Sequence, residues 1–283
     1  MQYITKQLPK DHNLFLFGDD HEGSRLRYDE GWRELVDMMH SSYKSCSNNY
    51  GLHHGDFAEF IQTDDKRYSF EVTQGNPQAQ MEAAEVNIRP IASKLVCMLD
   101  SNHPRTLHRF GDLSAMLCKA LNVPYGTYSC RMSYVDKEGK LMYKHYATHG
   151  RKGINSSADD PLRQRANMKL SLKRHLKAKA GDCVVMSKAH THKLLVCEPE
   201  PELYLTDTDG VLHQHYTKPD QTAQYIPHHQ RYYINTGSFL KLYPETGGYS
   251  GYGELAEYDP HELGFVILVV RDGIIQSADK IVI

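Results

Sequence analysis

Five times along this 283-residue chain, a short apolar segment typical of a buried strand is followed at once by residues able to bind a metal ion. These residues are Asp19 and His21, then Asp56, then Asn102 and His103, then His149, then His190 and His192. In open α/β sheets, the loops at the carboxyl ends of strands converge on one edge. The pattern therefore predicts an α/β fold in which distant parts of the chain meet at one site.

Strand and helix patterns alternate over the first two thirds of the chain, which favours α/β architecture. We expect strands at 13–17, 50–54, 94–99, 125–134, 141–148 and 182–186, and helices at 28–43, 78–92, 113–121 and 160–179. The last third predicts strands at 194–197, 203–206, 231–235 and 265–270. No repeat or linker divides the sequence, so we expect a single domain over residues 1–283.

Two further segments stand outside this alternation. The polar stretch from Thr63 to Gln80 is expected to be an insertion near the site, where it would shape substrate access. The stretch from Gly247 to Gly253 is rich in glycine and is expected to be a surface loop.

Composition limits the environment in which the chain works. The formal net charge of −2 argues against a general nucleic-acid coat, and no apolar run is long enough for a membrane helix. The six cysteines form no C-x-x-C pair, which is typical of reduced thiols in a cytoplasmic protein. The sequence gives no indication of the oligomeric state.

The types of the candidate ligands indicate a pair of transition-metal ions. Imidazole with carboxylate suits Mn, Fe, Zn or Ni, whereas a Ca or Mg site would be richer in oxygen. In an extended segment, residues two apart point the same way, so Asp19 and His21 are expected to share one ion, and His190 and His192 likewise. Asp56 is placed to bridge two ions, which would hold a water between them and lower its pKa.

The order of these motifs resembles the signature of the calcineurin-like metallophosphoesterases, which is D-x-H, G-D, G-N-H, H-G and G-H-x-H. The resemblance covers roughly the first two thirds of the chain. Ser101 and Ala189 stand where the family has glycine, and Ile234–Phe239 resembles the strand and turn that follow the last motif. The resemblance implies an α/β/β/α sandwich with two mixed β-sheets, the calcineurin-like phosphoesterase fold.

The same resemblance implies a role for each matched residue. Asp19, His21 and His192 would hold the first of two divalent ions, Asn102, His149 and His190 would hold the second, and Asp56 would bridge them. His103 matches the catalytic histidine, which stabilises the phosphoryl oxygens or protonates the leaving alkoxide. The reaction implied is in-line attack on a phosphate ester by a hydroxide that bridges the metals.

Several substrates are compatible with these residues. Protein phosphatases of this family continue Gly-Asp with Asp-Arg-Gly, and Gly55–Glu59 does not. His103 favours a phosphodiesterase acting on nucleotides or nucleic acid, because it can protonate a poor leaving group. A phosphomonoesterase acting on a small metabolite and a catalytically silent scaffold are the alternatives.

Other polar residues carry weaker predictions. Arg151 follows His149-Gly150 and is expected to meet a substrate phosphate. The basic helix predicted at 160–179 is either a solvated face or a track for a nucleic-acid backbone. His53 and His54 are not expected to bind metal, because adjacent side chains on a strand diverge.

Overall fold

Strand β2 (His12–Phe17) shows how the sequence builds two apolar layers at once. Alternate side chains of a strand point to opposite faces. Leu14 and Leu16 pack into one hydrophobic cluster, while Phe15 and Phe17 pack into another, and all four are fully buried. The strand is therefore covered on both faces. The computed structural model describes residues 1–65, 68–69, 71–218, 220–245 and 252–283.

A five-stranded mixed sheet contains β2 and has the strand order β13-β12-β2-β3-β4. The other members are β3 (Asn49–His53), β4 (Leu95–Met98), β12 (Gly264–Arg271) and β13 (Ile274–Val282). Strands β2, β3 and β4 are parallel, whereas β12 runs antiparallel to both β2 and β13. The carboxyl ends of β2, β3 and β4 therefore lie at one edge.

A six-stranded mixed sheet has the order β1-β5-β6-β7-β11-β8. Its strands are β1 (Gln2–Gln7), β5 (Ser129–Val135), β6 (Leu141–Thr148), β7 (Val185–Lys188), β8 (Leu194–Cys197) and β11 (Tyr232–Thr236). Strands β5 and β6 are antiparallel, whereas β6 and β7 are parallel. The loops after β6 and β7 therefore leave the sheet on the same side.

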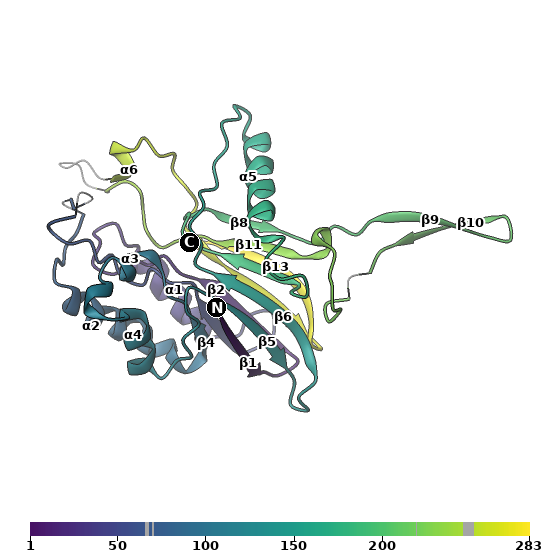
Figure 1. Cartoon of the computed structure of the whole chain (residues 1–283), viewed down its shortest axis with the longest axis horizontal. Helices are drawn as coiled ribbons and strands as arrows, with labels where there is room; N and C mark the ends of the chain where they lie inside the picture. The colour runs from purple at the N-terminus through teal and green to yellow at the C-terminus, as the bar shows by residue number, and fades with distance from the viewer. Residues whose placement is uncertain (66–67, 70, 219, 246–251) are drawn as a thin grey trace.

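The two sheets pack face to face, with helices on the outer faces (Figure 1). One cluster lies between the sheets and includes Leu16 from β2 and Ile234 from β11. Helices α1 (Asp29–His40), α2 (Pro77–Ile88) and α4 (Leu113–Leu121) cover the five-stranded sheet, and α5 (Pro161–Leu176) covers the six-stranded sheet. This arrangement confirms the expected mixed α/β architecture.

Some local predictions differ from the structure. Strands β1 and β13 were missed, and the strand predicted at 182–186 lies instead at Val185–Lys188. The end of the stretch predicted as an insertion, Pro77–Gln80, belongs to α2, and residues 66–67 and 70 of that stretch lie outside the described residues. The glycine-rich stretch falls largely on residues 246–251, which also lie outside them, and α6 (Tyr252–Leu255) follows. The remaining short helices are α3 (Asn102–Arg105), η1 (Arg89–Lys94), η2 (His108–Phe110) and η3 (His228–Gln230).

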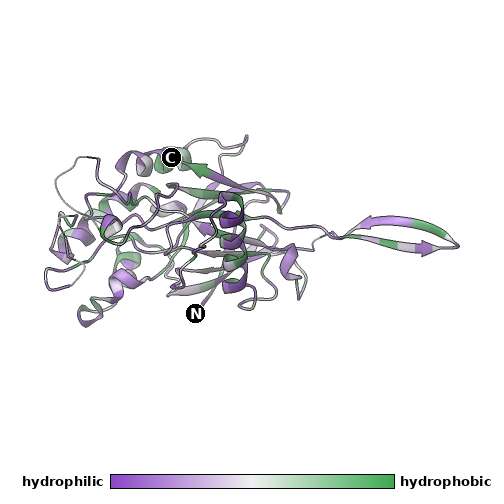
Figure 2. Ribbon diagram, turned by 90° about the horizontal axis from the view of Figure 1, so that it is seen from above, coloured by the Kyte–Doolittle hydropathy of each residue, from purple (hydrophilic) through white to green (hydrophobic). Residues whose placement is uncertain are grey.

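A two-stranded antiparallel hairpin, here called the arm, extends away from the body in both views (Figures 1 and 2). It comprises β9 (Leu203–Thr208) and β10 (Val211–Tyr216), and every residue of both strands is exposed. The turn is Asp209-Gly210, with φ of 52° and 77°, which suits the tight turn that the right-handed twist of a hairpin prefers. The sequence analysis predicted only the first of these strands.

Within the described residues, no helix has the length and apolar character that crossing a membrane requires. All six cysteine side chains are buried and none forms a disulfide.

The buried His12 should make stability depend on pH. Its Nδ1 donates to the carbonyl of Pro9 at 2.6 Å and its Nε2 accepts from the hydroxyl of Tyr143 at 2.8 Å, so the neutral ring is satisfied. Burial lowers the pKa of His12 from 6.5 to about 4. Between these values the unfolded chain binds a proton that the folded chain excludes. The stabilisation is therefore complete above pH 6.5 and is lost as the pH falls towards 4.

We expect the His12→Phe variant to lose less stability than the parent on going from neutral pH to pH ~5, by at most about 2 kcal/mol. Urea unfolding at several pH values measures this slope. The exposed His228→Phe variant serves as the control and should keep the slope of the parent. An unchanged slope in His12→Phe would contradict the assignment of His12 as a buried neutral residue.

Candidate metal centre

The predicted ligands lie in the loops at the carboxyl ends of five strands, and the two sheets bring these loops together. The placements are Asp19 and His21 after β2, Asp56 after β3, Asn102 after β4, His149 after β6, and His190 and His192 after β7. Asn102 and His103 also open the short helix α3. The structure therefore gathers all eight residues that the sequence analysis singled out.

The backbone at this site is unusual. Asp19, His21, Asp56, His190 and His192 all have positive φ, between 49° and 72°. A left-handed conformation costs an L-residue about 1–2 kcal/mol, and such strain persists where the surroundings impose it, often at functional sites. The prediction that the D-x-H and H-x-H segments are extended is wrong. The side chains of Asp19 and His21 still converge, because two left-handed residues turn the loop towards the cavity.

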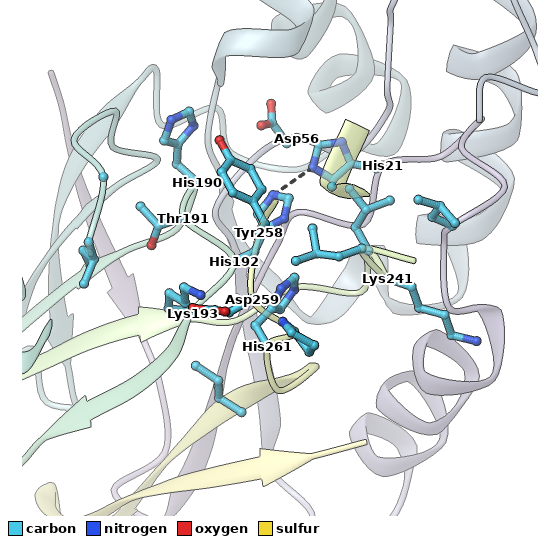
Figure 3. Close-up of a pocket in the computed structure, with 18 of the residues that line it drawn as sticks. His21, Asp56, His190, Thr191, His192, Lys193, Lys241, Tyr258, Asp259 and His261 are labelled. Carbon is cyan, nitrogen blue, oxygen red and sulfur yellow. Dashed lines mark hydrogen bonds between the residues drawn. The ribbon is translucent and has the colours of Figure 1, made fainter. Parts of the chain in front are cut away.

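One donor group consists of Asp19, His21 and His192, whose ligand atoms all lie within 4.8 Å of one another. The Nε2 atoms of His21 and His192 are 3.3 Å apart (dashed line in Figure 3). Oδ2 of Asp19 accepts the backbone N–H of His190 at 2.8 Å. Oδ1 of Asp19 is buried and has no hydrogen-bond partner among the described residues.

The second donor group consists of Asp56, His149 and His190, joined by Asn102. Nδ1 of His149 donates to the carbonyl of His54 at 2.8 Å, so the neutral ring carries its lone pair on Nε2. That Nε2 lies 2.7 Å from Oδ1 of Asn102, 3.2 Å from Oδ2 of Asp56 and 3.3 Å from Nδ1 of His190. The sequence prediction that His190 and His192 share one ion is wrong, because they lie in different groups.

The two groups fit divalent transition metals. Each presents imidazole nitrogens and carboxylate oxygens that face one another in a buried space, where a cation would relieve the repulsion between lone pairs. The unpaired Oδ1 of Asp19 lies 3.9 Å from Nδ1 of His149, which connects the groups. Asp56 belongs to the second group, and its backbone carbonyl accepts the N–H of His21 from the first group at 3.0 Å. Most of the ligand side chains are thus either oriented by a hydrogen bond or have an atom that is free to bind a cation.

Burial and neighbouring charges shift the pKa values of residues in both groups. Burial raises the pKa of Asp19 to about 7, even though His149 and His21 favour its charged form. Burial also opposes the charge of Asp56, yet His149 and His103 hold its pKa well below the usual range. Burial, together with His149, lowers the pKa of His190 to about 4. The histidine is thus held neutral, which is the form that binds metal.

His103 lies beside the cluster and belongs to neither donor group around the two aspartates. Its Nδ1 donates to the backbone carbonyl of Glu59 at 2.5 Å, and its backbone N–H donates to Oδ1 of Asp56 at 3.2 Å. The ring meets the ring of His21 edge to face at 4.7 Å. These contacts fix the orientation of the ring and leave its Nε2 without a hydrogen-bond partner among the described residues.

Glu59 is a site residue that the sequence analysis did not identify. Its carboxylate accepts Nδ1–H of His21 at 2.7 Å, and the residue also orients His103 through its carbonyl. Burial alone would lower the pKa of His21, but Glu59, together with Asp56 and Asp19, raises it to about 9. In the sequence, the only indication that Glu59 belongs to the site is that it follows Asp56 by three residues.

The two departures from the family pattern have structural consequences. The hydroxyl of Ser101 accepts the backbone N–H of Asp56 at 2.7 Å, so a serine here supports the loop that carries the aspartate. A Cβ at Gly55 would lie 2.6 Å from Cβ of Ser101, and Gly55 has φ of 96°. The backbone N–H of Ala189 donates to the carbonyl of His149 at 3.0 Å. Both replacements are compatible with the arrangement of the ligands.

A cavity of about 720 Å³ opens onto the cluster. His21, Asp56, His103, His190 and His192 line its inner end. Lys193, Lys241, Tyr258 and His261 line another part of it (Figure 3). Arg151 is exposed and also lines the cavity, so the expectation that it faces a substrate remains open. His261, whose ring centroid lies 5.8 Å from that of His192, was not predicted.

His53 and His54 lie behind the cluster and outside both donor groups. Nε2 of His53 donates to Asp20 at 2.8 Å, and Nε2 of His54 lies 2.6 Å from the hydroxyl of Ser187. The backbone carbonyl of His54 orients His149. These contacts support the loops that carry the candidate ligands.

We expect the Glu59→Ala variant to bind metal about 10–100-fold more weakly at the group that contains His21, because the imidazole loses the carboxylate that orients it. Competition with a chromophoric chelator measures this affinity. The Glu257→Ala variant removes an exposed carboxylate of the same cavity whose side chain forms no hydrogen bond or ion pair with a described histidine, and it should bind metal as the parent does. Equal affinities for Glu59→Ala and the parent would rule out the orienting role.

A scan against protein-family models gives no match for this chain, and a search of the curated proteins finds no matching sequence.

Proposed function

We propose that this chain is a binuclear metal-dependent phosphoesterase with the calcineurin-like fold, acting as a phosphodiesterase. The observation that supports this most is the pair of adjacent donor groups, Asp19/His21/His192 and Asp56/His149/His190, which line one cavity through His21, His192, Asp56 and His190. Two-metal hydrolytic sites hold their ions about 3.5–4 Å apart and use carboxylate and imidazole ligands of this kind. Bound divalent ions would polarise the phosphate and lower the pKa of a water molecule between them.

In this proposal the first donor group would hold one ion, Asn102, His149 and His190 would hold the other, and Asp56 would be shared between them. Glu59 fixes the ring of His21, and the carbonyl of His54 fixes the ring of His149. These orienting contacts prearrange the ligands, so little reorganisation is needed when metal binds.

His103 acts as the proton donor. Its Nδ1 is occupied by the carbonyl of Glu59, so the opposite nitrogen faces the substrate. From that position it can protonate the alkoxide that leaves a phosphodiester. An alkoxide is a poor leaving group, and a residue poised to protonate it favours a diester over an activated monoester.

The volume of the cavity favours a substrate that is larger than inorganic phosphate. Arg151, Lys193 and Lys241 line it together with Glu257, Asp259 and Glu262, and the cavity is large enough for a nucleotide. The substrate class proposed is therefore a nucleotide or a strand of nucleic acid. We propose that its hydrolysis takes place in the cytoplasm.

A paired assay on metal-stripped protein tests the function. The stripped chain is reloaded with Mn, Fe, Zn or Ni and given bis-(p-nitrophenyl) phosphate or p-nitrophenyl phosphate. We expect turnover that depends on metal and is faster for the diester. Faster turnover of the monoester would indicate a phosphomonoesterase acting on a small metabolite. Metal binding without turnover of either ester would contradict the enzyme assignment for these substrates and favour a silent scaffold.

A further inference from the structure

The arm, residues 203–216, exposes several large apolar side chains to solvent. Leu203, Leu205, Leu212 and Tyr216 are each 52–68% exposed. An isolated two-stranded hairpin is marginally stable in water, and exposed apolar patches mark interaction sites. Figure 2 colours parts of both arm strands as hydrophobic, far from the body of the molecule.

These side chains lie on one face of the arm. Residues paired across an antiparallel ladder share a face, and residues two apart on a strand do so as well. Leu203 pairs with Tyr216, Leu205 with Gln214 and Asp207 with Leu212. The opposite face carries Tyr204 and Val211 together with Thr206, Thr208 and the two histidines of β10. The first face, here called the apolar face, therefore carries four of the six large apolar side chains of the arm, with an acidic residue near its tip.

Helix α5 has the complementary surface. Its sequence holds five lysine and arginine residues and no carboxylate, whereas residues 203–216 hold Asp207 and Asp209 and no lysine or arginine. Leu162 and Leu170 on α5 are 79% and 63% exposed, with Arg163 and Arg174 exposed beside them. Neither of these arginines forms an ion pair with another described residue of its own chain. The helix thus offers apolar side chains and free positive charge on one exposed face.

The length of the arm is also similar to the length of helix α5. Six residues of strand extend about 20 Å and sixteen residues of helix extend about 24 Å. The base of the arm lies close to α5 of the same chain, because Lys173 contacts Glu200 at 2.7 Å. In its own chain the arm points away from α5 (Figure 1). A two-fold axis near the arm base would place the arm of each chain along α5 of the other.

We propose that the chain forms a two-fold symmetric homodimer in which the arm of each protomer lies along helix α5 of its partner. Such a contact is reciprocal and closed, so each dimer contains two identical arm–helix interfaces. The apolar face of the arm covers Leu162 and Leu170 of the partner subunit, and the acidic tip meets the basic residues of that helix. This proposal is independent of the proposed hydrolytic function.

Light scattering coupled to size exclusion, over a series of protein concentrations, measures the mass in solution. We expect the parent chain to be a dimer, and the double variant Leu205→Asp/Leu212→Asp to be a monomer. Thr208→Asp adds the same type of charge to the opposite face of the arm and should leave the dimer intact. A parent that stays monomeric at every concentration overturns the proposal and assigns the arm to a different partner.

A mixing experiment tests whether the arm meets the helix or a second arm. One variant lacks residues 203–216 and joins Glu202 to Thr217 through glycine, at a point where these residues already share a backbone hydrogen bond of 2.9 Å. The other variant is Arg163→Glu/Arg174→Glu. Each should be monomeric alone, but their mixture should form a heterodimer through the one remaining arm–helix contact. A mixture that stays monomeric while the parent dimerises overturns the arm–helix assignment.

Circular dichroism and metal content check that both variants are folded. The arm is fully exposed, and neither arginine contacts a metal ligand, so both variants should bind metal as the parent does. Failure to dimerise is thereby distinguished from failure of the metal centre.

Discussion

Replacing Asp56 by asparagine should reduce hydrolysis of the diester by at least about a thousandfold, which corresponds to about 4 kcal/mol of transition-state stabilisation. The substitution keeps the shape of the side chain but removes its charge. Asp56 is fully buried, lies 3.2 Å from Nε2 of His149 and accepts the N–H of His103. An amide there would share two divalent ions poorly, so we also expect fewer metal ions per chain.

Steady-state kinetics at saturating metal, with metal content measured on the same sample, provides the test. Asp20→Asn is a matched control, because Asp20 is also buried in the loop after β2 and its side chain accepts a hydrogen bond from His53. It should keep two ions and most of the activity. Full activity in Asp56→Asn would show that this residue does not belong to the metal centre.

Replacing His103 by alanine should lower kcat by about 10²–10⁴-fold while the metal content stays unchanged. His103 is oriented by Glu59 and lies at the cavity, but it is absent from the two groups that contain the aspartates. The loss should therefore appear with a diester that has an alkoxide leaving group, which needs a proton, rather than with bis-(p-nitrophenyl) phosphate. A substrate with a good leaving group should be affected much less.

The control for this variant is His108→Ala, an exposed histidine a few residues along the same loop region. It should leave both kcat and metal content as they are in the parent. A loss of metal from His103→Ala would show that the residue is a ligand, and an unchanged kcat would leave it without a catalytic role.

The site could be predicted because its residues occupy positions that sequence patterns can define. Each ligand follows an apolar strand, and parallel strands of one sheet end at a common edge. Phe15 and Phe17 alternate with Leu14 and Leu16 along a strand that is covered on both faces, and such a run is easily identified. The order of the motifs then indicated which loops belong together.

Other features depend on contacts that no local pattern encodes. The left-handed backbone at Asp19 and His190 is imposed by surrounding loops, since neither position is a glycine. Glu59 and His261 acquire their places through tertiary packing with His21 and His192. The second strand of the arm did carry a local signal, the Asp209-Gly210 turn, which typically joins two strands.

Manganese loading tests most directly whether Asp19, His21, Asp56, Asn102, His149, His190 and His192 form one binuclear centre. Metal-stripped protein is titrated with Mn²⁺, and bound metal is counted while electron paramagnetic resonance monitors coupling between the ions. We predict two ions per chain with a spin-coupled spectrum, and loss of that coupling in Asp56→Asn. A single ion per chain, or two uncoupled ions in the parent, would contradict the binuclear centre.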